Sequence, residues 1–423
     1  MRQWMVAAKK ADFYAIAEKF HVDPVVARII RNREVIGEKN IRIYLGGNLS
    51  DLSDPHQMKD MDRLVEILAQ KIRKQVHIRI IGDYDVDGVT SSHLFLTALR
   101  RVGAKVDVVI PHRIQDGYGL SLHLLQQAKE DGVDTILTCD NGIAAIDEIA
   151  WAKAQKMTVL VTDHHAVPFE EHEGRRTEKK SLADAVVNPH QQDCRYPYKE
   201  LCGAGVAWNV IRVLYENYDM DKREAEDLLD FVAMATVCDV MSLTGENRIL
   251  VKEGLKRIRH TKNIGLQALM QACNVQPENI SAYHFGYVLG PCVNATGRLD
   301  TARHALRLFE TGQETEAEEI ARDLVDLNQE RKELTLQGVE MAKKLCEEGG
   351  YEKDPVLVLF LPDVHESIAG LIAGRIREMY NRPVFVLTRG EEGVKGSGRS
   401  TENYSMYENM CGCAEPVSYT HLR

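Results

Sequence analysis

The sequence predicts an α/β protein: a domain with a mainly parallel sheet, joined by a long helix to a smaller α/β domain. Between about residues 76 and 162, short runs rich in β-branched residues alternate with segments of helical periodicity. A second unit of this kind begins at Pro355, after a charged stretch with helical spacing from Glu314 to Glu348. Strands that alternate with helices form βαβ crossovers, and such crossovers pair the strands in parallel.

The N-terminal segment, residues 1–45, is predicted to be helical and to precede the first sheet domain. It has no apolar core of signal-peptide length, because Asp12 and Glu18 interrupt it. The chain also has no apolar run of about 18 residues, so no membrane span is expected. Its nine cysteines contain no CxxC pair, which is typical of a reduced protein and predicts a cytoplasmic location.

Residues 46–312 are predicted to form the first sheet domain, with elements in a regular order. The expected strands are VHIRIIG, KVDVVI, DTILTC and MTVLVT, and the helices between them are VTSSHLFLTALRR, SLHLLQQAKED and AAIDEIAWAKAQ. After ADAVVN the pattern becomes helical, through AGVAWNVIRVLYENY and EAEDLLDFVAMATVC. Residues 313–350 then predict one long connecting helix, because apolar side chains recur at helical spacing among charges.

Residues 351–423 are predicted to form a partial α/β domain. The runs PVLVLFL and PVFVLT are expected strands, with a helix from Glu366 to Met379 between them. A sheet of this kind needs further strands to pair its edges, yet no alternating run follows GSGRS. We therefore expect an incomplete domain with an exposed sheet edge and a poorly ordered tail from about Glu415.

The overall charge gives no nucleic-acid footprint, so a nucleic-acid partner would need a local basic patch. The net charge is −10 and the isoelectric point is near 5.9. The most basic stretch runs from Arg248 to Lys262, with six Lys or Arg residues against one acid, Glu253. Such a stretch is equally typical of a DNA track and of a solvated helix face, and both interpretations stay open.

Three aspartates, Asp83, Asp85 and Asp87, alternate in the motif DYDVDG directly after the first predicted strand. An EF-hand calcium loop would need glutamate at its twelfth position, and that position is Leu94. A phosphatase of the haloacid dehalogenase type matches DVDGV locally, and a solvated acidic turn needs no ligand at all. These two alternatives remain open beside a metal cluster.

Other acidic and imidazole side chains follow further strands and favour the metal cluster. Asp140 comes directly after one predicted strand, Asp163, His164 and His165 come after another, and Asp239 follows an apolar helical run. Ligand sites in parallel sheets gather at the carboxyl ends of the strands. Mixed carboxylate and imidazole ligands suit Mn²⁺ or Mg²⁺, and so many acids predict two divalent ions.

The motifs DYDVDG, CDNG and TDHH, in this order, resemble the first three motifs of the DHH phosphoesterases. The runs LCGAGVAW, ATVCDVMSLTGENR, GPCVNATGRLDTA, VHESIAGLIAGRI and GSGRS resemble, more narrowly, the RecJ family of bacterial single-strand-specific 5′→3′ exonucleases. The resemblance extends over roughly residues 40 to 405. It implies a parallel-sheet DHH domain joined by a long helix to a smaller, here incomplete, DHH-associated domain.

The resemblance also implies roles for individual residues. It assigns Asp140 to a bridging position between two Mn²⁺ or Mg²⁺ ions, and gives His165 and Asp163 catalytic or ligand-orienting roles. The residues implied to bind metal are Asp83, Asp85, Asp87, Asp140, His164 and Asp239. The residues implied to bind phosphate or DNA, including a 5′-phosphate, are Arg113, Asn294, Arg298, Ser397 and Arg399; arginine suits this role because its planar fork binds phosphate bidentately.

The implied function is metal-dependent 5′→3′ hydrolysis of single-stranded DNA to 5′-mononucleotides in DNA repair and recombination. The implied partners are single-stranded DNA, a single-strand-binding protein and a helicase, with no membrane and a monomeric state. Two alternatives are a DHH-type phosphoesterase for short oligonucleotides or cyclic dinucleotides, and a non-catalytic replication scaffold on the same fold. No GGH motif follows GSGRS, unlike the family pattern, so weak and salt-dependent DNA binding is expected.

Overall fold

The computed structural model describes residues 9–410, apart from 114–115, 173–174, 391–392 and 407–408. The chain divides into two compact units, Met1–Gly297 with Thr301–Arg322, and Arg298–Asp300 with Asp323–Arg423. The tail expected to be poorly ordered, from about Glu415, lies outside the described residues.

The first unit begins with three short helices, α1 (Phe13–Phe20), α2 (Pro24–Asn32) and α3 (Glu38–Gly46). Asp12 and Asp23 cap the first two, because each side chain accepts a hydrogen bond from a backbone N–H of the first turn. A small apolar cluster joins the helices through Ile30, Val35, Ile41 and Tyr44.

The central sheet of the first unit has five parallel strands in the order β2-β1-β3-β4-β7. Its strands are β1 (Ile78–Ile81), β2 (Val106–Val109), β3 (Thr135–Cys139), β4 (Thr158–Thr162) and β7 (Ala185–Val187). Ile81 is paired with Thr138, and Thr138 with Val161, so β1, β3 and β4 end at nearly the same level. The predicted parallel α/β fold and its first four strands are confirmed.

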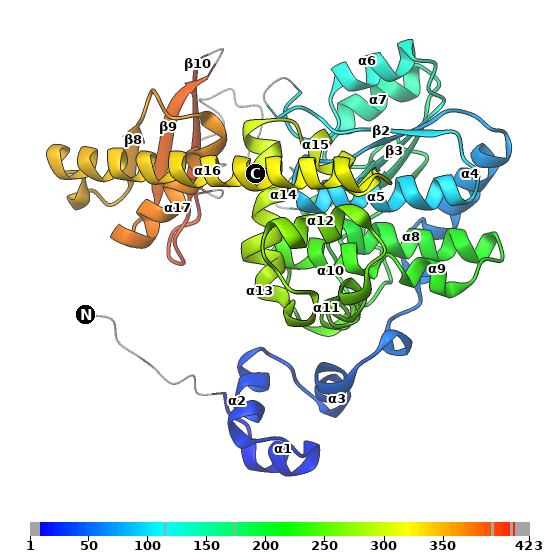
Figure 1. The fold of residues 1–423 in the computed structure, drawn as a ribbon, viewed down its shortest axis with the longest axis horizontal. Helices are drawn as coiled ribbons and strands as arrows, with labels where there is room; N and C mark the ends of the chain where they lie inside the picture. Colours follow the sequence, from blue (N-terminus) through cyan, green and yellow to red (C-terminus); the bar gives the residue numbers. More distant parts are fainter. Residues whose placement is uncertain (1–8, 114–115, 173–174, 391–392, 407–408, 411–423) are drawn as a thin grey trace. The chain divides into compact units, whose positions relative to one another are not determined.

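Helices cover both faces of this sheet (Figure 1). α6 (Leu122–Glu130) and α7 (Ile146–Ala154) lie on one face, over a core that includes Leu125, Ile136 and Ile149. On the other face lie three helices that pack on one another: α4 (Met61–Arg73), α5 (Val86–Arg101) and α8 (Gly203–Asn217).

The rest of the first unit is mainly helical, as expected. Its hairpin strands β5 and β6 and its helices α9 to α15 precede the long helix α16, which begins where the sequence predicted. These elements are β5 (Phe169–His172), β6 (Arg175–Glu178), α9 (Lys222–Glu226), α10 (Leu229–Cys238), α11 (Gly245–Arg257), α12 (Ile264–Ala272), α13 (Ala282–His284), α14 (Gly290–Leu299), α15 (Ala302–Glu310) and α16 (Glu314–Gly349).

Short helical turns connect several of these elements. Six are 3₁₀ turns and one, η5, is a π-helical turn. They are η1 (Leu49–Asp51), η2 (Pro55–Gln57), η3 (Ile258–His260), η4 (Pro277–Asn279), η5 (Phe285–Leu289), η6 (Tyr351–Lys353) and η7 (Glu366–Ile368).

The second unit contains a three-stranded sheet and one packed helix. The strands β8 (Leu357–Phe360), β9 (Val384–Gly390) and β10 (Gly393–Arg399) lie in the order β10-β9-β8, with β8 parallel and β10 antiparallel to β9. α17 (Ala369–Tyr380) packs on β9 and β10. The sequence did not predict β10, because three of its seven residues are glycine.

The outer face of this small sheet is open to solvent in the described part of the chain. Alternate residues of β8 are buried and exposed, and the exposed ones are Val358 and Phe360. Among the described residues, β8 and β10 are the two edges of the sheet. In the same part of the chain, we find no helix with the length and apolar character needed to cross a membrane.

Candidate metal centre

Carboxylates and imidazoles meet at the carboxyl ends of β1, β3 and β4. The DYDVDG motif follows β1, Asp140 follows β3 directly, and Asp163, His164 and His165 follow β4. The chain leaves β1 to form β2 on one side and returns to form β3 on the other. A reversal of strand order of this kind opens a crevice beyond the strand ends, where ligands bind in open α/β sheets.

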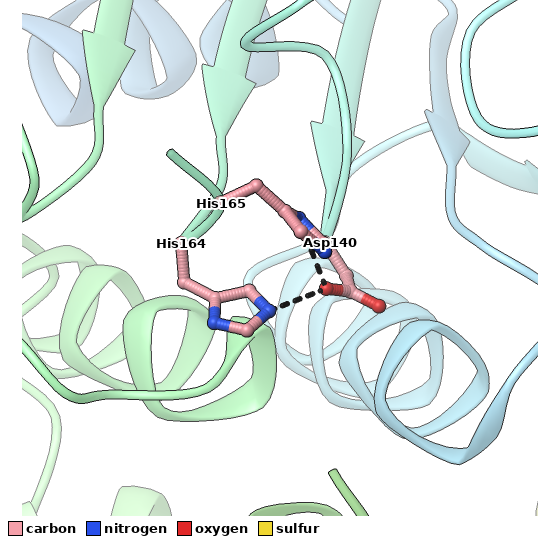
Figure 2. A group of neighbouring side chains, drawn as sticks. All are labelled: Asp140, His164 and His165. Carbon is pink, nitrogen blue, oxygen red and sulfur yellow. Dashed lines mark ion pairs between the residues drawn. The ribbon is translucent and has the colours of Figure 1, made fainter. Parts of the chain in front are cut away.

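His164 lies at the centre of the cluster. Its Nε2 atom is 3.1 Å from Oδ1 of Asp140, 3.6 Å from Oδ2 of Asp87 and 3.6 Å from Oδ2 of Asp239. Figure 2 shows the side chains of Asp140, His164 and His165 directed toward one another from neighbouring strand ends. Nδ1 of His165 is 3.9 Å from the same Asp140 oxygen.

Among the described residues, three overlapping groups bring possible metal ligands together, with ligand atoms within 4.8 Å of one another. Asp140 occurs in two groups, and His164 also occurs in two. A centre with shared ligands suits two neighbouring cations better than one. The groups are Asp140 with His164 and His165, Asp87 with His164 and Asp239, and Asp83 with Asp85 and Asp140.

Two buried atoms of the centre fit a cation. Oδ1 of Asp140 and Nε2 of His164 have no hydrogen-bond partner within the described residues, although they lie close to each other. Burial, followed by the charges of Asp87 and Asp85, raises the pKa of Asp140 well above its ordinary value. A divalent cation would supply the missing partner and offset the repulsion. Oxygen and imidazole ligands suit Mn²⁺ or Mg²⁺.

The carboxylates that follow β1 are held by helix N-termini. Asp85 caps α5, with its Oδ1 accepting a hydrogen bond from the Gly88 N–H at 3.1 Å. Asp87 accepts from the N–H groups of Gly203, at 2.6 Å, and Ala204, at 2.8 Å, in the first turn of α8. Both helix ends favour negative charge. The sequence did not predict that the LCGAGVAW motif would bind the Asp87 carboxylate.

Asp163 is fully engaged within the protein and is placed to orient His165. Its oxygens accept hydrogen bonds from the backbone N–H groups of Ile143, His164 and His165, at 2.7 to 3.0 Å. Oδ1 also lies 2.8 Å from Nδ1 of His165. Burial alone would raise the pKa of Asp163, but the hydrogen bond and charge of His165 bring it below the ordinary value. Asp163 occurs in none of the three ligand groups above.

The backbone at Asp140 is strained and held by its neighbours. Its φ of 61° lies in the left-handed region, a conformation that non-glycine residues adopt mainly where the surroundings enforce it. The Tyr118 hydroxyl donates to the Asp140 carbonyl at 3.1 Å and lies 3.3 Å from Nε2 of His165. Tyr118 is thus hydrogen-bonded beside the centre. The next residue, Asn141, donates to the carbonyls of Ile81 and Cys139 and ties β1 to β3.

Two of the predicted phosphate ligands lie in the first unit. The guanidinium of Arg113 lies 4.8 Å from the ring centroid of Tyr84, inside the DYDVDG motif. Oδ1 of Asn294 accepts a hydrogen bond from the Val86 N–H at 3.1 Å, so this atom fixes the same motif to α14. Their roles toward phosphate stay predictions.

The other three predicted phosphate ligands lie in the second unit. Arg298 donates from Nη1 to the Ser367 carbonyl at 2.8 Å, just before α17. The guanidinium of Arg399 packs against Gly370, since a Cβ atom there would lie 2.6 Å from Nη2. Both arginines therefore reach the turn that begins α17. Ser397 lies two residues before Arg399 on β10.

Comparisons with known proteins agree with this fold. Residues 77–236 match the DHH family, N-terminal domain. The chain is 36% identical to the single-stranded-DNA-specific exonuclease RecJ of Haemophilus influenzae, over 90% of this chain and 67% of that protein. Its match to RecJ of Bacillus subtilis is 32% identical and covers 95% of this chain and 49% of that protein.

Solved structures of RecJ proteins are also similar to this structure. A crystal structure of exonuclease RecJ bound to manganese is 32% identical and superposes with a TM-score of 0.72, over 84% of this chain and 85% of that one. RecJ of Thermus thermophilus in complex with Mn²⁺ is 28% identical, with a TM-score of 0.78, over 95% of this chain and 55% of that one.

The parallel sheet, with acids and histidines gathered beyond its strand ends, lies within the region that matches the DHH family, so the first unit contains a DHH domain. Six curated relatives named RecJ are between 31% and 36% identical to the chain. The chain belongs to the RecJ family. It spans about half to two thirds of the length of these relatives.

Proposed function

We propose that the chain is a metal-dependent exonuclease that hydrolyses single-stranded DNA from the 5′ end and releases 5′-mononucleotides. The observation that carries this proposal is the shared carboxylate and imidazole cluster around His164. Its setting in a RecJ-family chain supports DNA as the substrate. Two Mn²⁺ or Mg²⁺ ions bound there would supply an activated water and stabilise charge on the phosphate.

The chain's own residues would hold and orient the reacting groups. Asp140 and His164 each occur in two of the ligand groups and would be shared ligands, and Asp83, Asp85, Asp87 and Asp239 would be the further ligands. Asp163 fixes Nδ1 of His165, which leaves Nε2 beside the Tyr118 hydroxyl. About a third of the His165 side chain is exposed, whereas His164 is buried. His165 is therefore the histidine that we assign to the substrate.

Phosphate recognition would come from the cations that the resemblance implied. In the second unit, Arg298 reaches the turn before α17 and Arg399 reaches the first turn of α17. Ser397 adds a hydroxyl on β10, the strand that also holds Arg399. Arginine forks beside a helix N-terminus suit a terminal phosphate, so we assign these three residues to the 5′-phosphate. In the first unit, Arg113 lies beside the metal centre. We assign it to a phosphate of the same strand.

The proposed function is tested by a nuclease assay with Mn²⁺ or Mg²⁺ and then with excess chelator. We expect release of 5′-mononucleotides from 5′-phosphorylated single strands, weaker activity on 5′-hydroxyl strands, and none with chelator. Faster hydrolysis of a cyclic dinucleotide than of long strands would support the small-substrate alternative. Absence of all hydrolysis by a metal-loaded protein would support the scaffold alternative.

Arg399→Ala is expected to weaken binding of 5′-phosphorylated strands by about 1.5–3 kcal/mol, the contribution of a charge-assisted hydrogen bond. Binding of 5′-hydroxyl strands should hardly change, because they lack the terminal charge. The measurement is a titration with both kinds of strand. The matched control is Arg389→Ala, which removes an exposed arginine from the neighbouring strand β9. Equal losses on both strands would make Arg399 a general backbone contact.

Other predictions concern the partners, the oligomeric state and the location of the protein. Association with a single-strand-binding protein and a helicase, the monomeric state and the cytoplasmic location stay predictions. A role in DNA repair and recombination belongs to the same proposal.

A further inference from the structure

A continuous helical stretch, from α13 through η5 to α14, lies beside the metal centre. Near its start it packs on the end of α10, where the Cys238 thiol lies 3.3 Å from the Phe285 carbonyl and Asp239 follows. Further along, Asn294 binds the backbone of the DYDVDG motif through Val86. This stretch therefore contacts the residues next to Asp239 and the motif that contains Asp85 and Asp87.

Two tyrosines project from this stretch into solvent. Tyr283 is 63% exposed and Tyr287 is 72% exposed. Their rings are stacked on each other, with centroids 5.1 Å apart and planes 24° apart. Large aromatic rings are usually buried in a protein of this size, because each removes much apolar area from water. A stacked pair that is left open presents flat ring faces to a ligand.

Tyr287 lies within reach of the metal centre. It precedes Asn294 by seven positions, which corresponds to roughly 10 Å along a helix. The residue before Tyr287, Gly286, packs against Val237, two residues before Asp239. Tyr287 thus belongs to a segment that contacts the residues before Asp239, and Tyr283 lies four positions before it. Local π-helical turns, such as the one that contains Tyr287, are frequent at functional sites.

A third exposed apolar side chain directly follows one of the predicted ligands. Val240 directly follows Asp239 and is 87% exposed. Its φ of 57° is unfavourable for a β-branched residue, so the fold holds this side chain outward at a cost in strain. Val240, Tyr287 and Tyr283 are therefore exposed apolar side chains that belong to contacting parts of the fold, since α10 packs on η5.

A basic turn contacts the segment that precedes Tyr283. The turn η4, four residues before Tyr283, contacts η3 at the end of the basic stretch 248–262. Arg259 in η3 is exposed. A strand that passed the tyrosines toward η4 and η3 would bring its phosphates toward the Arg259 guanidinium.

We propose that Tyr283 and Tyr287 form a stacking platform for the unpaired bases that follow the nucleotide at the metal centre. Val240 contacts the nucleotide at the centre, and Arg259 contacts the backbone beyond the tyrosines. This inference rests on the proposed function, and it adds a reason for strand selectivity. Every unpaired base offers a flat face for stacking, whereas the bases of a duplex are already stacked and paired.

The test compares Tyr283→Ala and Tyr287→Ala with the corresponding Phe variants, which keep the ring. We expect each Ala variant to raise KM for a long single strand about tenfold or more, because stacking on one aromatic ring contributes that much affinity. kcat should stay unchanged, and the Phe variants should resemble the unmodified protein. The matched control is Tyr14→Ala, which removes a 77% exposed tyrosine on α1.

Two further measurements test whether the rise in KM comes from stacking of the bases that follow the first nucleotide. A dinucleotide should not reach the platform, so its KM should be equal in all variants. A strand with abasic positions after its first nucleotide should bind the unmodified protein more weakly than an intact strand does. The Ala variants and the unmodified protein should bind this abasic strand equally well. An unchanged KM of the Ala variants on long strands would overturn the platform, and so would an equal loss on the dinucleotide.

The same design separates failure of the platform from failure of the proposed function. If the unmodified protein hydrolyses no DNA, the exonuclease assignment fails. Equilibrium binding then still tests the platform. The measurement is the fluorescence anisotropy of a labelled single strand in the presence of each variant. Equal binding by the Ala variants and the unmodified protein would overturn the platform whatever the activity.

Discussion

Asp140→Asn is expected to abolish hydrolysis while the protein stays folded. Asp140 is shared between two of the three ligand groups, so its negative charge would serve both cations. Loss of one preorganised charge at the reacting phosphate should lower kcat by at least about 10²–10³-fold. Asparagine has nearly the same shape, and it tolerates the left-handed backbone that this position requires.

Stability of the metal-free protein provides the control for this variant. Burial and the neighbouring charges of Asp87 and Asp85 raise the pKa of Asp140, so its ionised form is unfavourable in the folded state. The carboxylate therefore destabilises the metal-free fold above its unfolded pKa, and the neutral amide removes this penalty. We expect metal-free Asp140→Asn to melt at or above the temperature of the unmodified protein. Added Mn²⁺ should raise its melting temperature less.

The two outcomes together decide the assignment. Full activity in a folded Asp140→Asn variant would contradict a shared metal ligand. An equal rise in melting temperature with Mn²⁺ would contradict it as well. Loss of activity with a large fall in the metal-free melting temperature would instead assign Asp140 a structural role.

Local sequence was enough to predict the main sheet but not every strand. The runs of β1, β3 and β4 are short, apolar and flanked by helical periods, so their pattern identifies buried parallel strands. The hairpin strands β5 and β6 are polar, and β10 contains Gly393, Gly396 and Gly398. Such segments become strands only through pairing with a neighbour, which the local pattern does not encode.

The sequence predicted the ligands of the candidate site but not the groups that hold them in place. The acids and histidines follow predicted strands, and parallel strands place such residues at one edge. The groups that hold them come from elements whose packing is not local: the α8 amides behind Asp87 and the Tyr118 hydroxyl beside His165. The run SAYHFGYVLG looks like a core segment in sequence. Only the fold shows that Tyr283 and Tyr287 are exposed.

Gly203→Ala is expected to cause nearly as large a loss of activity as removal of a ligand. A Cβ atom at this position would lie 2.6 Å from Cβ of Asp140 and 3.0 Å from its Cα. Asp140 cannot move away freely, because its strained backbone is tied to Tyr118. The first turn of α8 cannot move either without shifting Asp87, which the Gly203 N–H holds at 2.6 Å. The added methyl group must therefore displace at least one carboxylate of the centre.

The expected loss of kcat follows from the geometry that the reaction requires. A displacement on the order of 1 Å at reacting groups can lower kcat by about 10²-fold. Forcing a methyl group into a packed site should also lower the free energy of unfolding by about 1–3 kcal/mol. The measurements are kcat, the concentration of Mn²⁺ required for half-maximal activity, and the unfolding free energy in denaturant.

Gly205→Ala is the matched control, two residues along the same helix. There the nearest atoms to an added Cβ belong to Leu201 and begin at 3.4 Å, which is ordinary van der Waals contact. Because alanine favours a helix over glycine by up to about 1 kcal/mol, this variant should be as stable as the unmodified protein or more so, with full activity. Similar activity in the two variants would contradict the role of Gly203. A selective loss in Gly203→Ala would show that close packing of α8 against Asp140 sets the geometry of the metal centre.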